Sequence, residues 1–143
     1  MSTIPAFLDA LATTAKTATG LLVGQGTLLN TQHDFVIIGY DEDTQPAVKG
    51  RRVPTNAGPV PGEAYTVHNL ISTWIGDADP KPARDKLFTH LDEIDAAFIA
   101  DETLGVDAVI TSGIGDFELA QPITGQGAVA VLHFYVDVTA TTL

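Results

Sequence analysis

The chain has 143 residues, 45% of them hydrophobic, and a formal net charge of -11 at pH 7. This length predicts one domain, residues 1–143, with a core large enough to fold without covalent staples. The absence of cysteine excludes a disulfide framework, a thiolate metal site and a cysteine nucleophile. The negative charge argues against specific binding of nucleic acid or of an anionic membrane, because both need clustered Lys and Arg.

An amphipathic helix is predicted over residues 4–19. Its apolar residues recur at helical spacing, and Pro5 suits the first turn. Ser2 or Thr3 is expected to cap its start, and Gly20 is expected to end it. The sequence contains no signal-peptide pattern and no apolar run long enough to cross a bilayer, so we expect a soluble protein.

The segment after this helix predicts a short strand, a buried strand and a long loop. Residues 21–33 predict a short strand and a turn, and the apolar run at residues 35–40 predicts a strand buried on both faces. Residues 44–62 are rich in proline and glycine and predict a long loop, which in a compact domain is usually functional. We expect this loop to dock on an acidic neighbour. Its basic residues are Lys49, Arg51 and Arg52.

A long strand is predicted over residues 64–75, followed by a second helix. Asp79 suits the N-cap of this helix, and Pro80 suits its first turn. Apolar residues then recur at helical spacing, and Gly105 is expected to end the helix.

The last part of the chain predicts an antiparallel hairpin. Residues 106–117 predict a strand with a bulge at its glycines, residues 118–127 a turn, and residues 128–139 a strand with alternating buried positions. The order of elements predicts an α+β fold. We expect a mixed or antiparallel sheet of about four strands with two helices packed on one face.

Two of the predicted strands carry apolar or aromatic side chains on the face opposite the expected core. Leu70 and Trp74 lie on that face of one strand, and Val131 and Tyr135 lie on that face of the other. Large exposed apolar patches on soluble proteins mark partner surfaces, so these four are candidate interface residues. In the alternative interpretation, both faces are covered within the monomer, one by each helix.

No pattern of catalytic, cofactor-binding or metal-binding residues stands out. The histidines His33, His68, His90 and His133 lack metal-ligand spacing, and we expect them in a loop or at surface or partly buried positions. The acidic run at residues 41–43 lacks the spacing of a calcium loop and is interpreted as a turn that ends a strand. We therefore expect no enzymatic activity, no cofactor and no metal.

Four segments and their order carry a family resemblance. They are residues 34–43 (DFVIIGYDED), 66–79 (TVHNLISTWIGDAD), 83–105 (ARDKLFTHLDEIDAAFIADETLG) and 125–138 (GQGAVAVLHFYVDV). Together they resemble the tail terminator or minor tail proteins of siphoviruses, the long-tailed bacteriophages. In that family a Gly-Asp-x-Asp turn leads into a helix, then into Asp-x-x-Leu-Gly, then into a closing hairpin.

The resemblance implies a homohexameric ring in the virion, assembled in the host cytoplasm. Such a ring caps the last ring of tail-tube subunits at the head-proximal end, stops tube growth and gives the head connector a docking surface. DNA is expected to pass through the lumen without specific binding, because an acidic lumen repels it.

Two alternatives remain open. One is a head-tail connector or stopper ring of the same particle. The other is a small ligand-binding or hydrolytic α+β domain, which would have a concave pocket with convergent polar groups.

Overall fold

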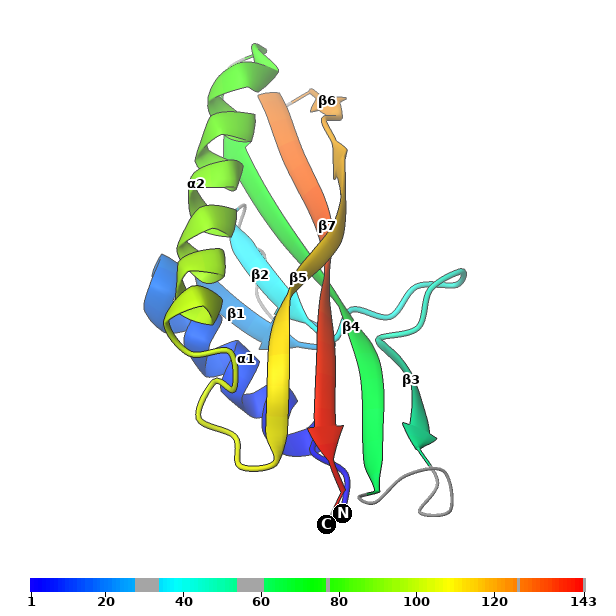
Figure 1. Ribbon diagram of the computed structural model, residues 1–143. Helices are drawn as coiled ribbons and strands as arrows, with labels where there is room; N and C mark the ends of the chain where they lie inside the picture. The colour runs from blue at the N-terminus through cyan, green and yellow to red at the C-terminus, as the bar shows by residue number, and fades with distance from the viewer. Residues whose placement is uncertain (28–33, 54–60, 77, 126, 143) are drawn as a thin grey trace.

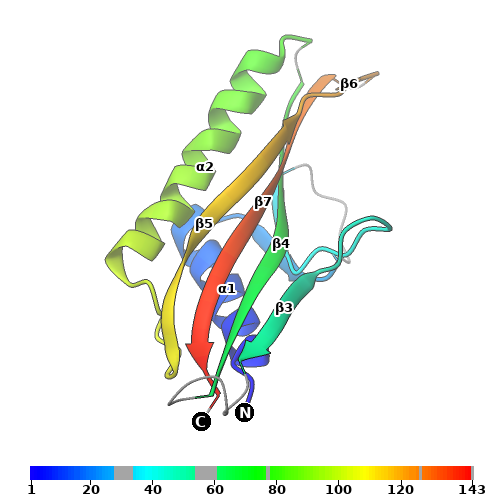
Figure 2. The same ribbon diagram turned by 45° about the vertical axis from the view of Figure 1, so that its right-hand side comes forward.

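The computed structural model describes residues 1–27, 34–53, 61–76, 78–125 and 127–142. Within these residues the chain forms two helices, α1 (Ile4–Thr19) and α2 (Pro80–Ala100). It also forms seven strands: β1 (Leu22–Gln25), β2 (Phe35–Ile38), β3 (Val48–Val53), β4 (Gly62–Ile75), β5 (Val109–Ala120), β6 (Ile123–Thr124) and β7 (Gly127–Thr141). All the strands belong to one sheet, and both helices lie on the same face of it (Figure 1 and Figure 2).

The sheet is mixed and larger than expected. Its order is β1-β2-β4-β7-β5, with β3 paired to β4 and β6 paired to β7. The β1–β2 pair is parallel, and the remaining pairs in the described residues are antiparallel. The α+β class and the two helices are confirmed. The prediction of about four strands was too low, because it did not count β1, β3 and β6 as strands of the sheet.

The prediction of a loop at residues 44–62 is wrong in part, because Val48–Val53 form the edge strand β3 along the first half of β4. Glycine composition misled the prediction. A Cβ atom at Gly50 would lie 2.6 Å from the Cβ of Tyr65, so glycine is what allows β3 to approach β4. Residues 54–60 of the predicted loop and residues 28–33 of the earlier strand-and-turn segment lie outside the described residues.

The core lies between the helices and the sheet. β4 and β7 pair along their whole length, from Gly62 opposite Thr141 to Ile75 opposite Ala128. Alternate residues of β7 point toward the helices, which confirms the predicted alternation. The largest completely buried core side chains include Phe7 and Leu11 of α1, Leu87 and Ile94 of α2, Ile71 of β4, and Leu132 and Phe134 of β7.

The starts of both helices and the end of α1 follow the sequence signals. Gly20 adopts a left-handed conformation, with φ of 70°, and its N–H donates to the carbonyl of Lys16 at 2.9 Å. The Asp79 carboxylate accepts a hydrogen bond from the Lys81 N–H at 3.0 Å at the start of α2. At the start of α1, the Ser2 hydroxyl accepts the N–H of Ile4 at 3.1 Å.

The end of α2 was predicted too late. The helix ends at Ala100 rather than at Gly105. The side chain of Asp101 accepts the N–H groups of Thr103, at 3.0 Å, and of Gly105, at 3.1 Å, and so turns the chain away from the helix axis. Gly105, with φ of 75°, lies in that following turn.

The closing hairpin is confirmed. β5 and β7 are antiparallel, and register shifts between Val109 and Thr111 and between Ile114 and Phe117 confirm a bulged strand. β5 continues to Ala120, so its last residues and β6 occupy much of the segment predicted as a turn.

The two ends of the chain lie side by side (Figure 1), and a buried carboxylate fixes the start of α1 to β4. Glu63 accepts hydrogen bonds from the N–H and hydroxyl of Thr3, at 2.7 and 2.8 Å, and from the hydroxyl of Ser2 at 3.1 Å. Thr3 also shares a 2.8 Å hydrogen bond with the phenol of Tyr65. Burial raises the pKa of Tyr65 to about 12, so this phenol stays neutral at physiological pH.

Candidate assembly interface

The four apolar candidates do lie on one face of two adjacent strands. On the helix-free face of the sheet, Leu70 is opposite His133, and Trp74 is opposite Val129. Val131 and Tyr135 lie on the same face of β7. Leu70 is only 8% exposed, whereas Trp74, Val131 and Tyr135 are half-buried. The strand pairing thus joins the two predicted sets into one surface that the helices leave uncovered.

Part of this surface is covered by an arch loop, residues 41–46, between β2 and β3. Both strands pair with the same edge of β4. The N–H of Tyr40 donates to the carbonyl of His68 at 2.7 Å, and the N–H of His68 donates to the carbonyl of Ala47 at 2.8 Å. The pairing of β4 with the chain before the arch loop and its pairing with the chain after the loop therefore meet at His68. The arch loop projects from the sheet edge between Tyr40 and Ala47 (Figure 1). The phenol of Tyr135 donates to the side-chain carbonyl of Gln45.

A cluster of histidines lies beneath the arch loop, and sequence spacing gave no sign of it. His68 is 2% exposed, so its expected surface or partly buried position is wrong. Its Nε2 lies 2.8 Å from Nδ1 of His133, whose Nδ1 lies 3.2 Å from Oε1 of Glu42. Burial lowers the pKa of His68, and the adjacent His133 lowers it further against the opposing effect of Glu42. The two histidines meet only because β4 and β7 are neighbours in the sheet.

His90 does not join this cluster. His90 lies on α2, where its Nδ1 is 2.8 Å from the carboxylate of Glu93. His33 lies outside the described residues.

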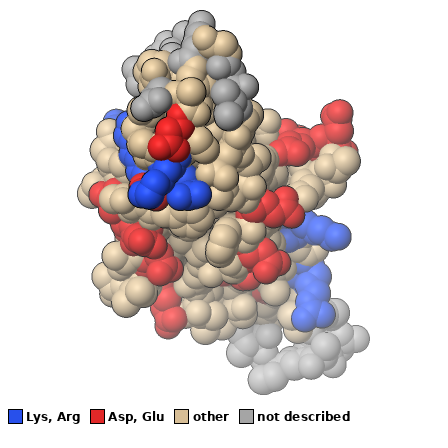
Figure 3. Space-filling view, turned by 90° about the horizontal axis from the view of Figure 1, so that it is seen from above, with Lys and Arg blue, Asp and Glu red and all other residues tan. Residues whose placement is uncertain are grey.

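The three basic candidates lie on β3 and are all exposed. Arg52 is paired with Glu63, so it lies on the helix side of the sheet. Lys49 and Arg51 alternate with it and lie on the helix-free side, where they line a shallow groove with Asp137. The basic trio is therefore divided between two faces of one edge strand. Figure 3 colours all Lys and Arg side chains of the molecule, which form two separate groups on the face that it displays.

The opposite edge of the sheet is formed by β5, which the sequence did not single out as a surface. No strand in the described residues pairs with its outer side. Phe117 and Ile110 on β5 are 52% and 55% exposed, and Ile99 on the adjacent α2 is 80% exposed. The position of Ile99, one helical turn after the solvent-exposed Asp95, is a signal that could have identified this patch.

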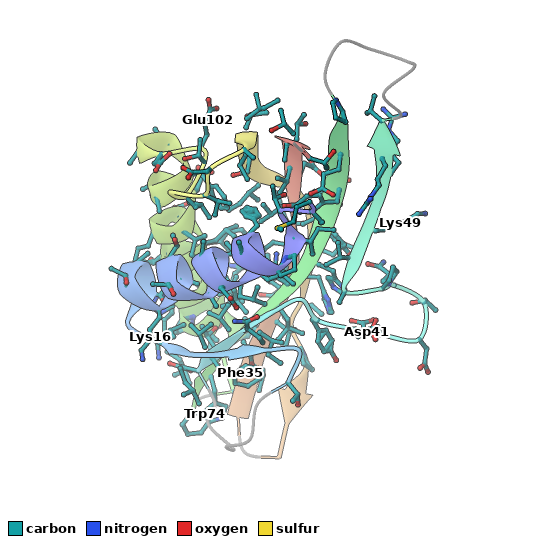
Figure 4. All side chains as sticks on the ribbon, turned by 90° about the horizontal axis from the view of Figure 1, so that it is seen from below. Lys16, Phe35, Asp41, Lys49, Trp74 and Glu102 are labelled. Carbon is teal, nitrogen blue, oxygen red and sulfur yellow. The ribbon has the colours of Figure 1, made fainter. Side chains whose placement is uncertain are left out.

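The two edges carry opposite charges. Asp116 and Glu118 are exposed on β5, and Glu102 is exposed in the turn before it. Glu102 and Lys49 lie on opposite sides of the molecule in Figure 4. A basic edge and an acidic edge on one subunit are complementary surfaces for a second copy of the same chain.

The fold has a counterpart among solved structures. No protein-family model matches the sequence, and no curated protein sequence matches it. The structure is similar to a chain of the "Virion of native gene transfer agent (GTA) particle", with a TM-score of 0.55 and 5% sequence identity, over 89% of this chain and 84% of that chain. Neither of the described helices is long and apolar enough to cross a membrane. At this identity, the likeness establishes a shared fold.

Proposed function

We propose that this chain is a structural, non-enzymatic subunit of a phage-like particle, and that it forms the ring that terminates the tail tube. The observation that carries the proposal is the fold shared with a chain of a gene transfer agent virion over 89% of this chain and 84% of the other. The resemblance of four sequence segments to siphovirus tail terminators supports the same role. In this role the ring caps the last tube ring and provides the docking surface for the head connector.

The two unlike edges of the sheet supply a contact that can close into a ring. A heterologous contact joins different surfaces of identical subunits and closes when its rotation permits. In this proposal, β5 of one subunit lies beside β3 of the next. β3 and β5 run antiparallel within one subunit. A ring axis roughly along the strands keeps them antiparallel between neighbours, so the sheet would continue from subunit to subunit by backbone hydrogen bonds.

Charge and apolar area both favour this pairing. Lys49 and Arg51 would approach Asp116 and Glu118 of the next subunit, which sets the register of the contact. The exposed Phe117 would lose contact with water there. The net charge of -11 suits a lumen through which DNA passes without binding.

Charge reversal and charge exchange test the pairing. We expect Lys49→Glu with Arg51→Glu to abolish ring formation on tube ends, because like charges would then face each other. Adding Asp116→Lys and Glu118→Lys should restore rings, because opposite charges meet again. Lys16→Glu with Lys81→Glu, which changes the net charge equally at two helical sites, is the matched control.

Electron microscopy of tubes assembled with each variant reads out ring formation. Rings that persist after reversal, or that the exchange does not restore, would refute the β3–β5 contact. Co-purification with a portal protein alone, and never with tube subunits, would indicate a head-tail connector rather than a tail terminator.

A further inference from the structure

Three side chains of metal-ligating type converge on the helix-free face. Glu42 comes from the arch loop, His68 from β4 and His133 from β7. One ligand atom of each lies within 4.8 Å of the others. The closest approaches are 2.8 Å between the two imidazole nitrogens and 3.2 Å between His133 and the carboxylate.

Hydrogen bonding alone does not satisfy this arrangement. Nδ1 of His133 faces both His68 Nε2 and Glu42 Oε1, and one nitrogen carries at most one proton. If Nδ1 is protonated, two acceptors share that proton. If it is not, its lone pair faces the carboxylate oxygen 3.2 Å away. Nδ1 of His68, which has no hydrogen-bond partner among the described residues, cannot relieve either arrangement.

We propose that Glu42, His68 and His133 bind a zinc-class transition-metal ion. Two imidazoles and one carboxylate are the ligand set of open zinc sites, in which water completes the coordination. Ligand bonds of about 2.0–2.1 Å in a tetrahedron set neighbouring ligand atoms about 3.3 Å apart, so small side-chain shifts bring the three atoms into place. Imidazole ligands favour zinc, copper or nickel over magnesium and calcium.

Aromatic neighbours hold the imidazole ligands in position. Tyr135 stacks on the His68 ring with centroids 4.9 Å apart and an interplanar angle of 10°. Tyr40 packs edge-on against the same ring at 5.5 Å. The acidic Glu118 lies opposite His133 on β5. Packed imidazole ligands beside an acidic side chain favour binding of a cation at this position.

The ion would join the arch loop to the two central strands. Glu42 is the arch-loop ligand of the cluster, and the loop leads directly into β3. Metal binding therefore fixes the loop relative to the sheet and stabilises the folded chain by mass action. This inference does not depend on the proposed role in a particle.

The test uses the full chain without a histidine tag. After treatment with a chelator and dialysis against zinc chloride, we expect about one zinc per chain by mass spectrometry of the metal, and a higher Tm. In amide NMR spectra, zinc should shift resonances of the arch loop and of the residues beside His68 and His133. Binding should weaken about tenfold or more in Glu42→Gln and His133→Ala.

The controls separate ligand loss from unfolding. The Glu42 side chain is 32% exposed, so Glu42→Gln should keep the fold even if His133→Ala does not. His90→Ala removes a histidine on α2 that pairs with Glu93, and this variant should bind zinc like the unmodified chain. Absence of zinc binding, equal binding by Glu42→Gln, or loss of binding in His90→Ala would each overturn the site.

Discussion

Neutralising Glu63 should loosen the attachment of α1 to the sheet. Glu63→Gln keeps the shape of the side chain but removes the charge that accepts three hydrogen bonds from Ser2 and Thr3. Hydrogen bonds to a charged group contribute about 1.5–3 kcal/mol each, against about 0.5–1.5 kcal/mol for neutral pairs. We expect a loss of about 1 kcal/mol at each of the two hydrogen bonds that Thr3 donates to Glu63. The free energy of unfolding at pH 7 should therefore fall by about 2 kcal/mol. This corresponds to a Tm lower by about 4–8 °C.

The pH dependence gives the sharper test. Burial raises the pKa of Glu63, but hydrogen bonds from Thr3 and Ser2 and the nearby Arg52 outweigh it, so the pKa is lowered overall. Because the pKa of Glu63 is lower in the folded chain, the ionised carboxylate stabilises the protein fully above the pKa of the unfolded chain, about 4.3. This stabilisation is lost as the pH falls through the folded-state pKa. The Tm difference between Glu63→Gln and the unmodified chain should therefore shrink below about pH 4.

Scanning calorimetry from pH 3 to pH 8 measures both effects. Asp95→Asn removes an exposed carboxylate and is the control, because it changes net charge equally without removing this contact. A Glu63→Gln deficit that stays constant down to pH 3, or that Asp95→Asn reproduces, would contradict the hydrogen-bonded carboxylate as its source.

Two further substitutions test the sheet and its open face. Gly50→Ala should separate β3 from β4 and lower the Tm, because the new Cβ would lie 2.6 Å from the Cβ of Tyr65. An unchanged Tm by calorimetry would show that this close approach does not constrain residue 50. Trp74→Ala should leave a folded chain that assembles poorly, because the indole is only half-buried on the helix-free face. Loss of the circular dichroism signal of the folded chain, rather than of assembly alone, would assign Trp74 to the core.

Local signals predicted the helices and long strands well because they depend on neighbouring residues. α1 begins after Thr3 and ends before Gly20, where proline and glycine punctuate the helical spacing. The alternation in β7 correctly predicted its buried face. The same local logic failed at β3, where glycine and basic residues indicate a loop unless the partner strand is known.

The candidate site needed information that no short segment contains. Leu70, Trp74, Val131 and Tyr135 were assigned to a common outer face from alternation, but their adjacency depends on the β4–β7 register. The strand order alone places the basic and acidic edges at opposite ends of the sheet. His68 and His133 are 65 residues apart and meet through that same register, so metal-ligand spacing could not indicate them.

The length of tail tubes assembled with and without this chain tests the central claim most directly. Tube subunits would be assembled in its presence and absence, and tube lengths and ends compared by electron microscopy. The ring-forming terminator role predicts tubes of limited length that carry a ring of this protein at one end, and overlong tubes with bare ends in its absence. Equal length distributions, with no ring of this protein at either end, would contradict that role.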